Sequence, residues 1–142
     1  MKLLLLLLLL FPTTKTPVIH YRQLSWEDYR APVPPNATND AITCTNISIG
    51  LDTAYAVFYP DRSWMRSADS ALLRHEQVHF AITRDYAKIV DSYLKCPFDD
   101  CREKVGKIIE AWRNTERQYD LDTNHGTDTL AQKQWEQKIN TN

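Results

Sequence analysis

The chain has 142 residues, which is enough for one domain with one core. Its 17 basic residues nearly balance its 18 acidic ones. The sequence therefore has neither the excess of positive charge typical of nucleic-acid-binding proteins nor a tail of like charges. The 4 Trp, 7 Tyr and 4 Phe favour a packed core, and only 3 glycines argue against an all-β fold with many tight turns.

The first 17 residues are predicted to be a secretory signal peptide. Lys2 precedes an apolar run over residues 3–11, far shorter than the roughly 20 residues that span a bilayer. No A-x-A-like site follows, so the cleavage point is left open, and an uncleaved anchor is the alternative. The sequence therefore predicts a secreted or periplasmic protein whose single folded domain covers residues 18–142.

Strands are predicted in the next part of the chain. Residues 18–26 are rich in β-formers and predict a first strand, while residues 31–40 hold three prolines and predict a loop. Residues 42–49 and 53–59 are two further β-like runs, and residues 50–52 between them predict a hairpin.

Residues between Ser67 and Pro97 predict a long amphipathic helix, with Ser67 as its N-cap and Pro97 marking its end. At about 100° per residue, the apolar side chains gather on one side together with His75 and His79. The histidines are thus expected on the buried stripe, where unpartnered polar groups are costly. A metal ion shared by both would remove that cost.

Two further helices are predicted, one from near Asp100 and one from about Thr127. Residues 119–128 between them are dense in polar side chains and predict a loop. His125 lies in this loop, directly before Gly126, where the backbone can turn freely.

The three cysteines agree with export. Cys96 and Cys101 flank Pro97 and predict a disulfide that closes the turn between the first two helices, with two free thiols as the alternative. Cys44 is left over and is expected to be a small buried residue.

The run from His75 to His79, HEQVH, has the spacing of a zinc-binding helix. Histidines four apart lie on one helix face, and the adjacent Glu76 can lean over that face, beside a zinc-bound water. Zinc lowers the pKa of such a water to about 7. Glu76 is expected to take the water's proton and pass it to a leaving amine. A chance match on an ordinary amphipathic helix is the alternative.

A catalytic zinc site normally has three protein ligands and one open position. His125 is the predicted third ligand, and Glu116, on the apolar stripe of the second helix, is the runner-up. Asp85 is rejected because it projects away from the two histidines if their helix continues. The remaining histidine, His20, is expected to be structural or exposed.

Several side chains near His125 could support such a site. Asp120 and Asp122 are candidates for orienting a ligating imidazole. Tyr119 or Tyr86 is a candidate donor to a developing oxyanion. For each of the four, a purely structural role is the alternative.

Three motifs resemble those of a family of secreted bacterial proteins of unknown function that are regarded as predicted zinc-dependent proteases of the zincin superfamily. The motifs are His75-Glu-Gln-Val-His79-Phe80, Tyr119-Asp120-x-x-Thr123-x-His125-Gly126 and Gln132-x-x-Trp135. The resemblance implies an α+β, zincin-like fold in which a small antiparallel or mixed sheet precedes a long active-site helix and two further helices.

The same resemblance implies roles for individual residues. His75, His79 and His125 would be the ligands of Zn²⁺, with Glu76 as the general base. In zincins an extended peptide pairs with an edge strand before the active-site helix, and residues 54–59 are the candidate strand here.

The predicted function is zinc-dependent hydrolysis of a peptide bond outside the cytoplasm. The expected partner is a peptide or protein substrate, with no nucleic acid and no membrane span beyond the leader, and a monomer is expected. One alternative is an exported zincin-fold protein that binds zinc or peptide without turnover, its site closed by Glu116. Others are a helical interaction domain with an accidental HEQVH, and a hydrolase acting on a non-peptide amide such as a cell-wall crosslink.

Overall fold

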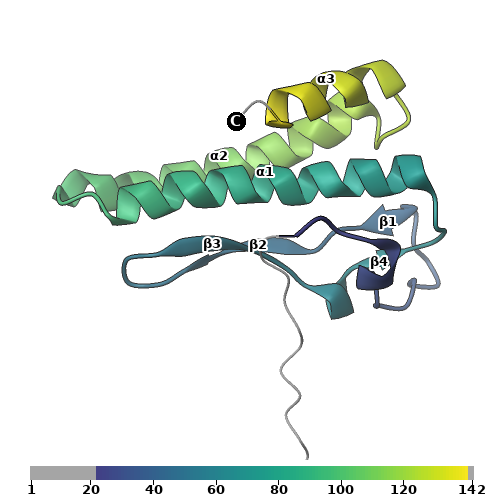
Figure 1. Cartoon of the computed structure of the whole chain (residues 1–142), viewed down its shortest axis with the longest axis horizontal. Helices are drawn as coiled ribbons and strands as arrows, with labels where there is room; N and C mark the ends of the chain where they lie inside the picture. Colours follow the sequence, from purple (N-terminus) through teal and green to yellow (C-terminus); the bar gives the residue numbers. More distant parts are fainter. Residues whose placement is uncertain (1–21, 141–142) are drawn as a thin grey trace, which may run out of the picture.

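The computed structural model describes residues 22–140 and confirms an α+β fold (Figure 1). Three helices and two small antiparallel sheets make up this part of the chain. None of its helices is long and apolar enough to cross a membrane. The predicted leader, His20 and residues 18–21 of the predicted first strand lie outside the described residues.

The strands pair in two separate two-stranded sheets rather than in one. The pairs are β1 (Ala41–Ile42) with β4 (Trp64–Met65), and β2 (Thr45–Ile49) with β3 (Ala54–Phe58). The second pair confirms the predicted hairpin, whose turn is closed by the Gly50 N–H donating to the Thr53 carbonyl over 2.8 Å.

A continuous strand over residues 42–49 is a wrong prediction, because the chain changes sheets at Cys44. There the Cys44 N–H donates to Ser63 Oγ over 2.9 Å, and the Cys44 carbonyl accepts from the Tyr59 N–H over 3.0 Å. The Cys44 carbonyl thus still faces the residue that follows β3, whereas its N–H is taken by a side chain rather than by a neighbouring strand.

The predicted first strand is also wrong over its described part, where a 3₁₀ turn, η1 (Trp26–Asp28), is found. Asp28 is buried, and its carboxylate accepts hydrogen bonds of 2.7 Å from the Ser25 N–H and from the Arg22 guanidinium. A short polar side chain that binds nearby backbone in this way competes with strand formation.

The helices are α1 (Ser70–Leu94), α2 (Asp99–Thr123) and α3 (Thr129–Asn140). Helices α1 and α2 lie side by side and antiparallel, the β2–β3 hairpin lies beneath α1, and α3 lies across the opposite side (Figure 1). Helix α1 ends before Pro97, as predicted. Its N-cap is Asp69 rather than Ser67, because the Asp69 carboxylate accepts the Leu72 N–H over 2.8 Å.

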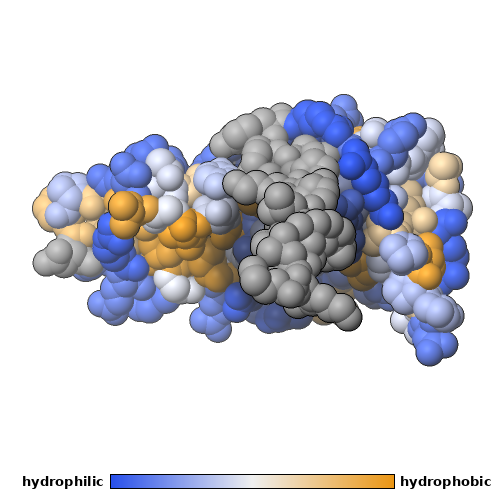
Figure 2. Space-filling view, turned by 90° about the horizontal axis from the view of Figure 1, so that it is seen from below, coloured by the Kyte–Doolittle hydropathy of each residue, from blue (hydrophilic) through white to orange (hydrophobic). Residues whose placement is uncertain are grey.

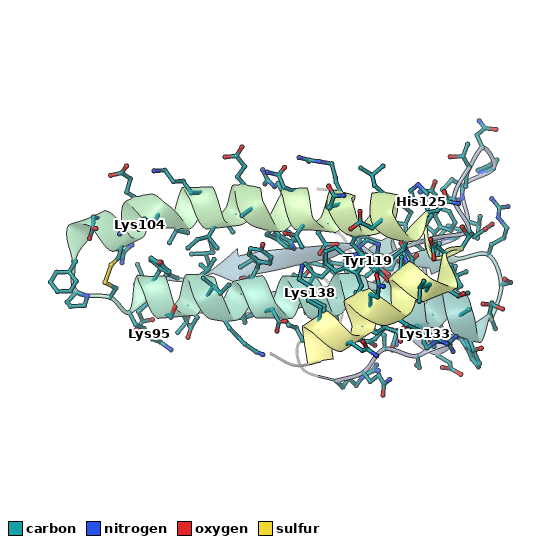
Figure 3. All side chains as sticks on the ribbon, turned by 90° about the horizontal axis from the view of Figure 1, so that it is seen from above. Lys95, Lys104, Tyr119, His125, Lys133 and Lys138 are labelled. Carbon is teal, nitrogen blue, oxygen red and sulfur yellow. A yellow bond between two sulfur atoms is a disulfide. The ribbon has the colours of Figure 1, made fainter. Side chains whose placement is uncertain are left out.

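Cys96 and Cys101 form the predicted disulfide, which closes the turn between α1 and α2 and is visible at one end of the helix pair (Figure 3). A crosslink over so short a loop stabilises a fold by on the order of 2 kcal/mol in the chain-entropy account. Cys44 is a free thiol and is half-buried rather than buried.

The core lies between the hairpin and α1 and continues between α1 and α2. Phe58 from β3 meets Phe80 from α1, with ring centroids 6.0 Å apart, and both are fully buried. Burying a side chain of this kind contributes about 1.5–3 kcal/mol. This packing holds one face of α1 on the hairpin and leaves another face for α2.

Seen from the hairpin side, hydrophobic residues gather in patches among hydrophilic ones (Figure 2). Ile49 and Leu51, at the hairpin tip, are exposed. Neither lines the cleft beside α1 and α2 in which the candidate site lies.

Candidate metal centre

Two pairs of polar side chains, each four residues apart, face one another across α1 and α2. His75 and His79 come from α1, and Glu116 and Asp120 come from α2. Residues four apart share a helix face, so each helix presents its pair to the other. Ligand atoms of His75, His79 and Asp120 lie within 4.8 Å of one another.

The geometry of these three groups fits a zinc ion. The Nε2 atoms of His75 and His79 lie 3.1 and 3.0 Å from Oδ1 of Asp120. In tetrahedral coordination, with bonds of roughly 2.0–2.2 Å, neighbouring ligand atoms are about 3.3 Å apart. Both imidazoles thus lie near this spacing from the Asp120 oxygen, all three ligand atoms lie within 4.8 Å of one another, and a fourth position would stay open.

Glu116 orients His79 rather than joining these three groups. One carboxylate oxygen accepts a hydrogen bond from Nδ1 of His79. The other accepts from Nε1 of Trp112 over 3.0 Å and from the Thr83 hydroxyl over 3.1 Å. With its Nδ1 held in this way, His79 turns Nε2 towards Asp120, so Glu116 has the orienting role that the sequence suggested for Asp120 and Asp122.

Gln132, from α3, orients His75. Its Oε1 lies 3.2 Å from Nδ1 of His75 and accepts the Tyr119 hydroxyl over 2.7 Å, while its amide nitrogen donates to Glu136 over 2.9 Å. Because Glu136 holds the amide nitrogen, Oε1 is the atom that faces His75, so Nδ1 of His75 donates to it while Nε2 points towards Asp120. Gln132 belongs to the motif Gln132-x-x-Trp135, but no role was predicted for it from the sequence.

The ionisable side chains of the centre shift one another's pKa values. Burial alone would lower the pKa of His79. Hydrogen bonds to Asp120 and Glu116 and the nearby charge of Glu76 outweigh this effect and raise the pKa to about 10. Burial raises the pKa of Asp120, but the two imidazoles more than offset this and hold it well below its usual range. Without metal, a proton on His79 therefore balances part of the negative charge.

Glu76 lies in the same cleft as His75 and His79 and is only 5% exposed. Its negative charge acts on His79 and on Tyr119, which places it close to the centre. Within the described residues its carboxylate takes part in no hydrogen bond or ion pair. A carboxylate left free in this position suits a general base.

His125 stands at the rim of the centre, in the loop after α2 (Figure 3). Its side chain is 68% exposed, and its Nδ1 lies 3.6 Å from Oδ1 of Asp120. It is not among the three groups whose ligand atoms converge. The geometry therefore puts the Asp120 carboxylate in the third position, and a ligand role for His125 stays a prediction.

The other residues singled out from the sequence serve the packing of the helices. Tyr119, fully buried between α1 and α2 (Figure 3), stacks on His75 with ring centroids 4.7 Å apart, and its hydroxyl is held by Gln132. Asp122 accepts the Trp135 indole N–H over 3.1 Å, and the Tyr86 hydroxyl bonds Thr115 over 2.7 Å. None of these three lines the cleft, so the geometry gives no support for an oxyanion role for either tyrosine.

The cleft has a volume of about 630 Å³. One wall carries the metal-centre residues of α1 and α2, and the other is formed by residues 38–45, which include β1, together with Arg62. Residues 54–59, predicted as the substrate-pairing strand, do not line it, because β3 packs beneath α1 in the hairpin sheet. The strand residues that line the cleft belong to β1, with Thr45 at the start of β2.

Gly126 permits the loop to pack directly on the metal centre. Its φ is +83°, and a Cβ added there would lie 2.8 Å from Cγ of His75. We expect Gly126→Ala to lower the free energy of unfolding by about 1–3 kcal/mol. Gly106→Ala, inside α2 with nothing within 4 Å of the added Cβ, should instead raise it by about 0.5–1 kcal/mol. Urea unfolding of the metal-free variants measures both, and equal effects would contradict this account.

Residues 24–126 match the model of one family, described as bacterial protein of unknown function (DUF922). Neither the curated proteins nor the solved structures give a significant match. The matched segment contains His75, Glu76, His79 and Asp120 and ends at Gly126.

Proposed function

The chain belongs to the bacterial family DUF922, and we propose, from the geometry of its own residues, that it is a zinc-dependent peptidase of zincin-like fold. The observation that carries the proposal is a free carboxylate, Glu76, beside two imidazoles and a carboxylate whose ligand atoms converge in an open cleft. A zinc ion held there would polarise a substrate carbonyl and lower the pKa of a bound water to about 7.

The chain's own residues would divide the work as follows. His75, His79 and Asp120 hold the metal, while Gln132 and Glu116 keep each imidazole turned with Nε2 inward. Glu76 accepts the proton of the attacking water and returns it to the leaving nitrogen.

The wall opposite α1 suits an extended peptide. Within the described part of the chain, strand β1 pairs with β4 along one edge, and its residues line the cleft, so its other edge can add a substrate strand. Main-chain pairing of this kind gives affinity without requiring one particular sequence.

Two further observations support the proposal. A structural zinc site would need a fourth protein ligand, and Glu116, the candidate for that position, already accepts from Nδ1 of His79. The Cys96–Cys101 disulfide fits an oxidising compartment, so we place the peptidase outside the cytoplasm, as the predicted leader implies.

Zinc binding and zinc-dependent cleavage test the proposal together. Metal-free protein should bind one zinc per chain by calorimetry, His79→Ala should abolish this binding, and affinity should rise with pH because zinc displaces the proton on His79. The loaded protein should cleave members of a peptide pool, read by mass spectrometry, and a chelator should stop cleavage until zinc is returned. Absence of stoichiometric zinc, or zinc bound equally by His79→Ala, would contradict the proposal.

A further inference from the structure

Arg62 brings a fixed positive charge to a cleft whose other charged groups are mostly carboxylates. It ends the 3₁₀ turn η2 (Pro60–Arg62) and, among the described residues that line the cleft, it is the one lysine or arginine. The acidic residues that share this lining are Asp40, Glu76, Glu116 and Asp120.

The exposed Arg62 guanidinium lies over an aromatic ring and is not neutralised by a described carboxylate. Its Cζ lies 5.2 Å above the ring of Tyr59, an arrangement that restrains the plane of the group. Within the described chain, no carboxylate lies at ion-pair distance from it and no carbonyl accepts from its side chain.

Arg66, four residues further on, shows what an arginine with a structural role does here. Its guanidinium donates to the carbonyls of Ala37 and Asn39 over 2.9 and 3.3 Å and lies 3.6 Å from the Asp40 carboxylate. Arg66 thus fastens residues 37–40 in the cleft wall. Arg62 has no such task, so its five N–H donors stay available to a ligand.

We propose that Arg62 binds a carboxylate of the substrate, so that the cleft selects peptides carrying a negative charge at one distance from the bond that is cut. This inference rests on the proposed peptidase function. A planar guanidinium pairs with a carboxylate through two parallel N–H···O bonds, which supply direction as well as charge. Because the carboxylates around the metal centre repel a second negative group, the same cleft disfavours a substrate carboxylate placed elsewhere.

The selected carboxylate has two possible sources, a C-terminus or an acidic side chain, and a series of peptide hydroxamates distinguishes them. The hydroxamate anchors each probe on the bound zinc. Dipeptide and tripeptide members would be made with a free or an amidated C-terminus, and with Glu or Gln at each position. Calorimetry on the zinc-loaded full-length protein then gives the dissociation constant of each member.

For one placement of the carboxylate along the peptide, the hydroxamate that carries it should bind about 10-fold more tightly than the matching amide. That preference should nearly vanish in Arg62→Gln and persist in part in Arg62→Lys. Arg84→Gln is the matched control, because Arg84 also lies over an aromatic ring, that of Phe80 at 5.7 Å, but outside the cleft.

Two outcomes separate this inference from the function on which it rests. Hydroxamates that bind without any preference for a carboxylate, or with one that survives Arg62→Gln, would overturn the role of Arg62 and leave the peptidase proposal standing. Hydroxamates that fail to bind the metal-loaded protein would overturn both.

Discussion

Glu76→Gln is expected to lower the rate of peptide cleavage by about 10²- to 10⁴-fold while zinc binding stays unchanged. Glutamine keeps the shape of the side chain, so packing next to His75 and His79 is preserved. It cannot accept the proton of the attacking water, because its amide is not a base at neutral pH. The loss should therefore appear in kcat, with KM nearly constant.

Glu110→Gln is the matched control for this substitution. Glu110 is an exposed glutamate of α2 that does not line the cleft, so its variant should cleave like the unmodified protein. Kinetics on one cleaved peptide, together with zinc content, measure both variants. Cleavage that survives Glu76→Gln at full zinc occupancy would remove Glu76 from the chemistry.

The face of α1 that carries His75 and His79 was predictable from the sequence because helical periodicity is a strong signal. His75 and His79 fall among the apolar residues of that stripe, and the structure places them at the junction of α1 with α2. A pair of buried imidazoles needs a shared partner, and this requirement pointed to a metal without any knowledge of α2.

Asp120 was not predicted as the third ligand because the end of α2 was placed too early, and the predicted ligand role of His125 remains a prediction. Residues 119–128 were predicted to form a loop, whereas α2 continues to Thr123 and has Asn124, whose φ is +46°, as its C-cap. The polar side chains that suggested a loop are compatible with a helix, since residues 107–125 contain neither glycine nor proline. With the helix extended, Glu116 and Asp120 share one face and both reach the histidines.

The short strands carry too little sequence information to be predicted. β1 and β4 have two residues each, so no alternation can be read from them, and their pairing depends on how the chain bends at Cys44 and Ser63. The predicted substrate strand was therefore assigned to the longer run now seen as β3. Pairing between segments so far apart in sequence is decided by tertiary packing rather than by local pattern.

Asp120→Asn is expected to weaken zinc binding by more than about 100-fold, whereas His125→Ala should change it by less than about 10-fold. Removing a residue that merely orients a metal ligand already weakens metal binding by about 10- to 100-fold, so removing a ligand should weaken it by more. Asp120 has its Oδ1 at 3.0–3.1 Å from both Nε2 atoms, while His125 is largely exposed. Competition with a coloured chelator at neutral pH measures both variants, with Asp122→Asn as the matched control outside the cleft.

The pKa of His79 shows whether a weaker affinity in Asp120→Asn reflects a lost ligand. Asp120 makes the strongest of the interactions that raise this pKa to about 10, so the substitution should lower it in the metal-free protein. The proton would then compete less with zinc, and by itself this change would make zinc bind more tightly. A lower affinity together with a lower His79 pKa, followed by NMR titration, therefore identifies the Asp120 carboxylate as a ligand. If His125→Ala instead lost more zinc affinity than Asp120→Asn, the third zinc ligand would be His125.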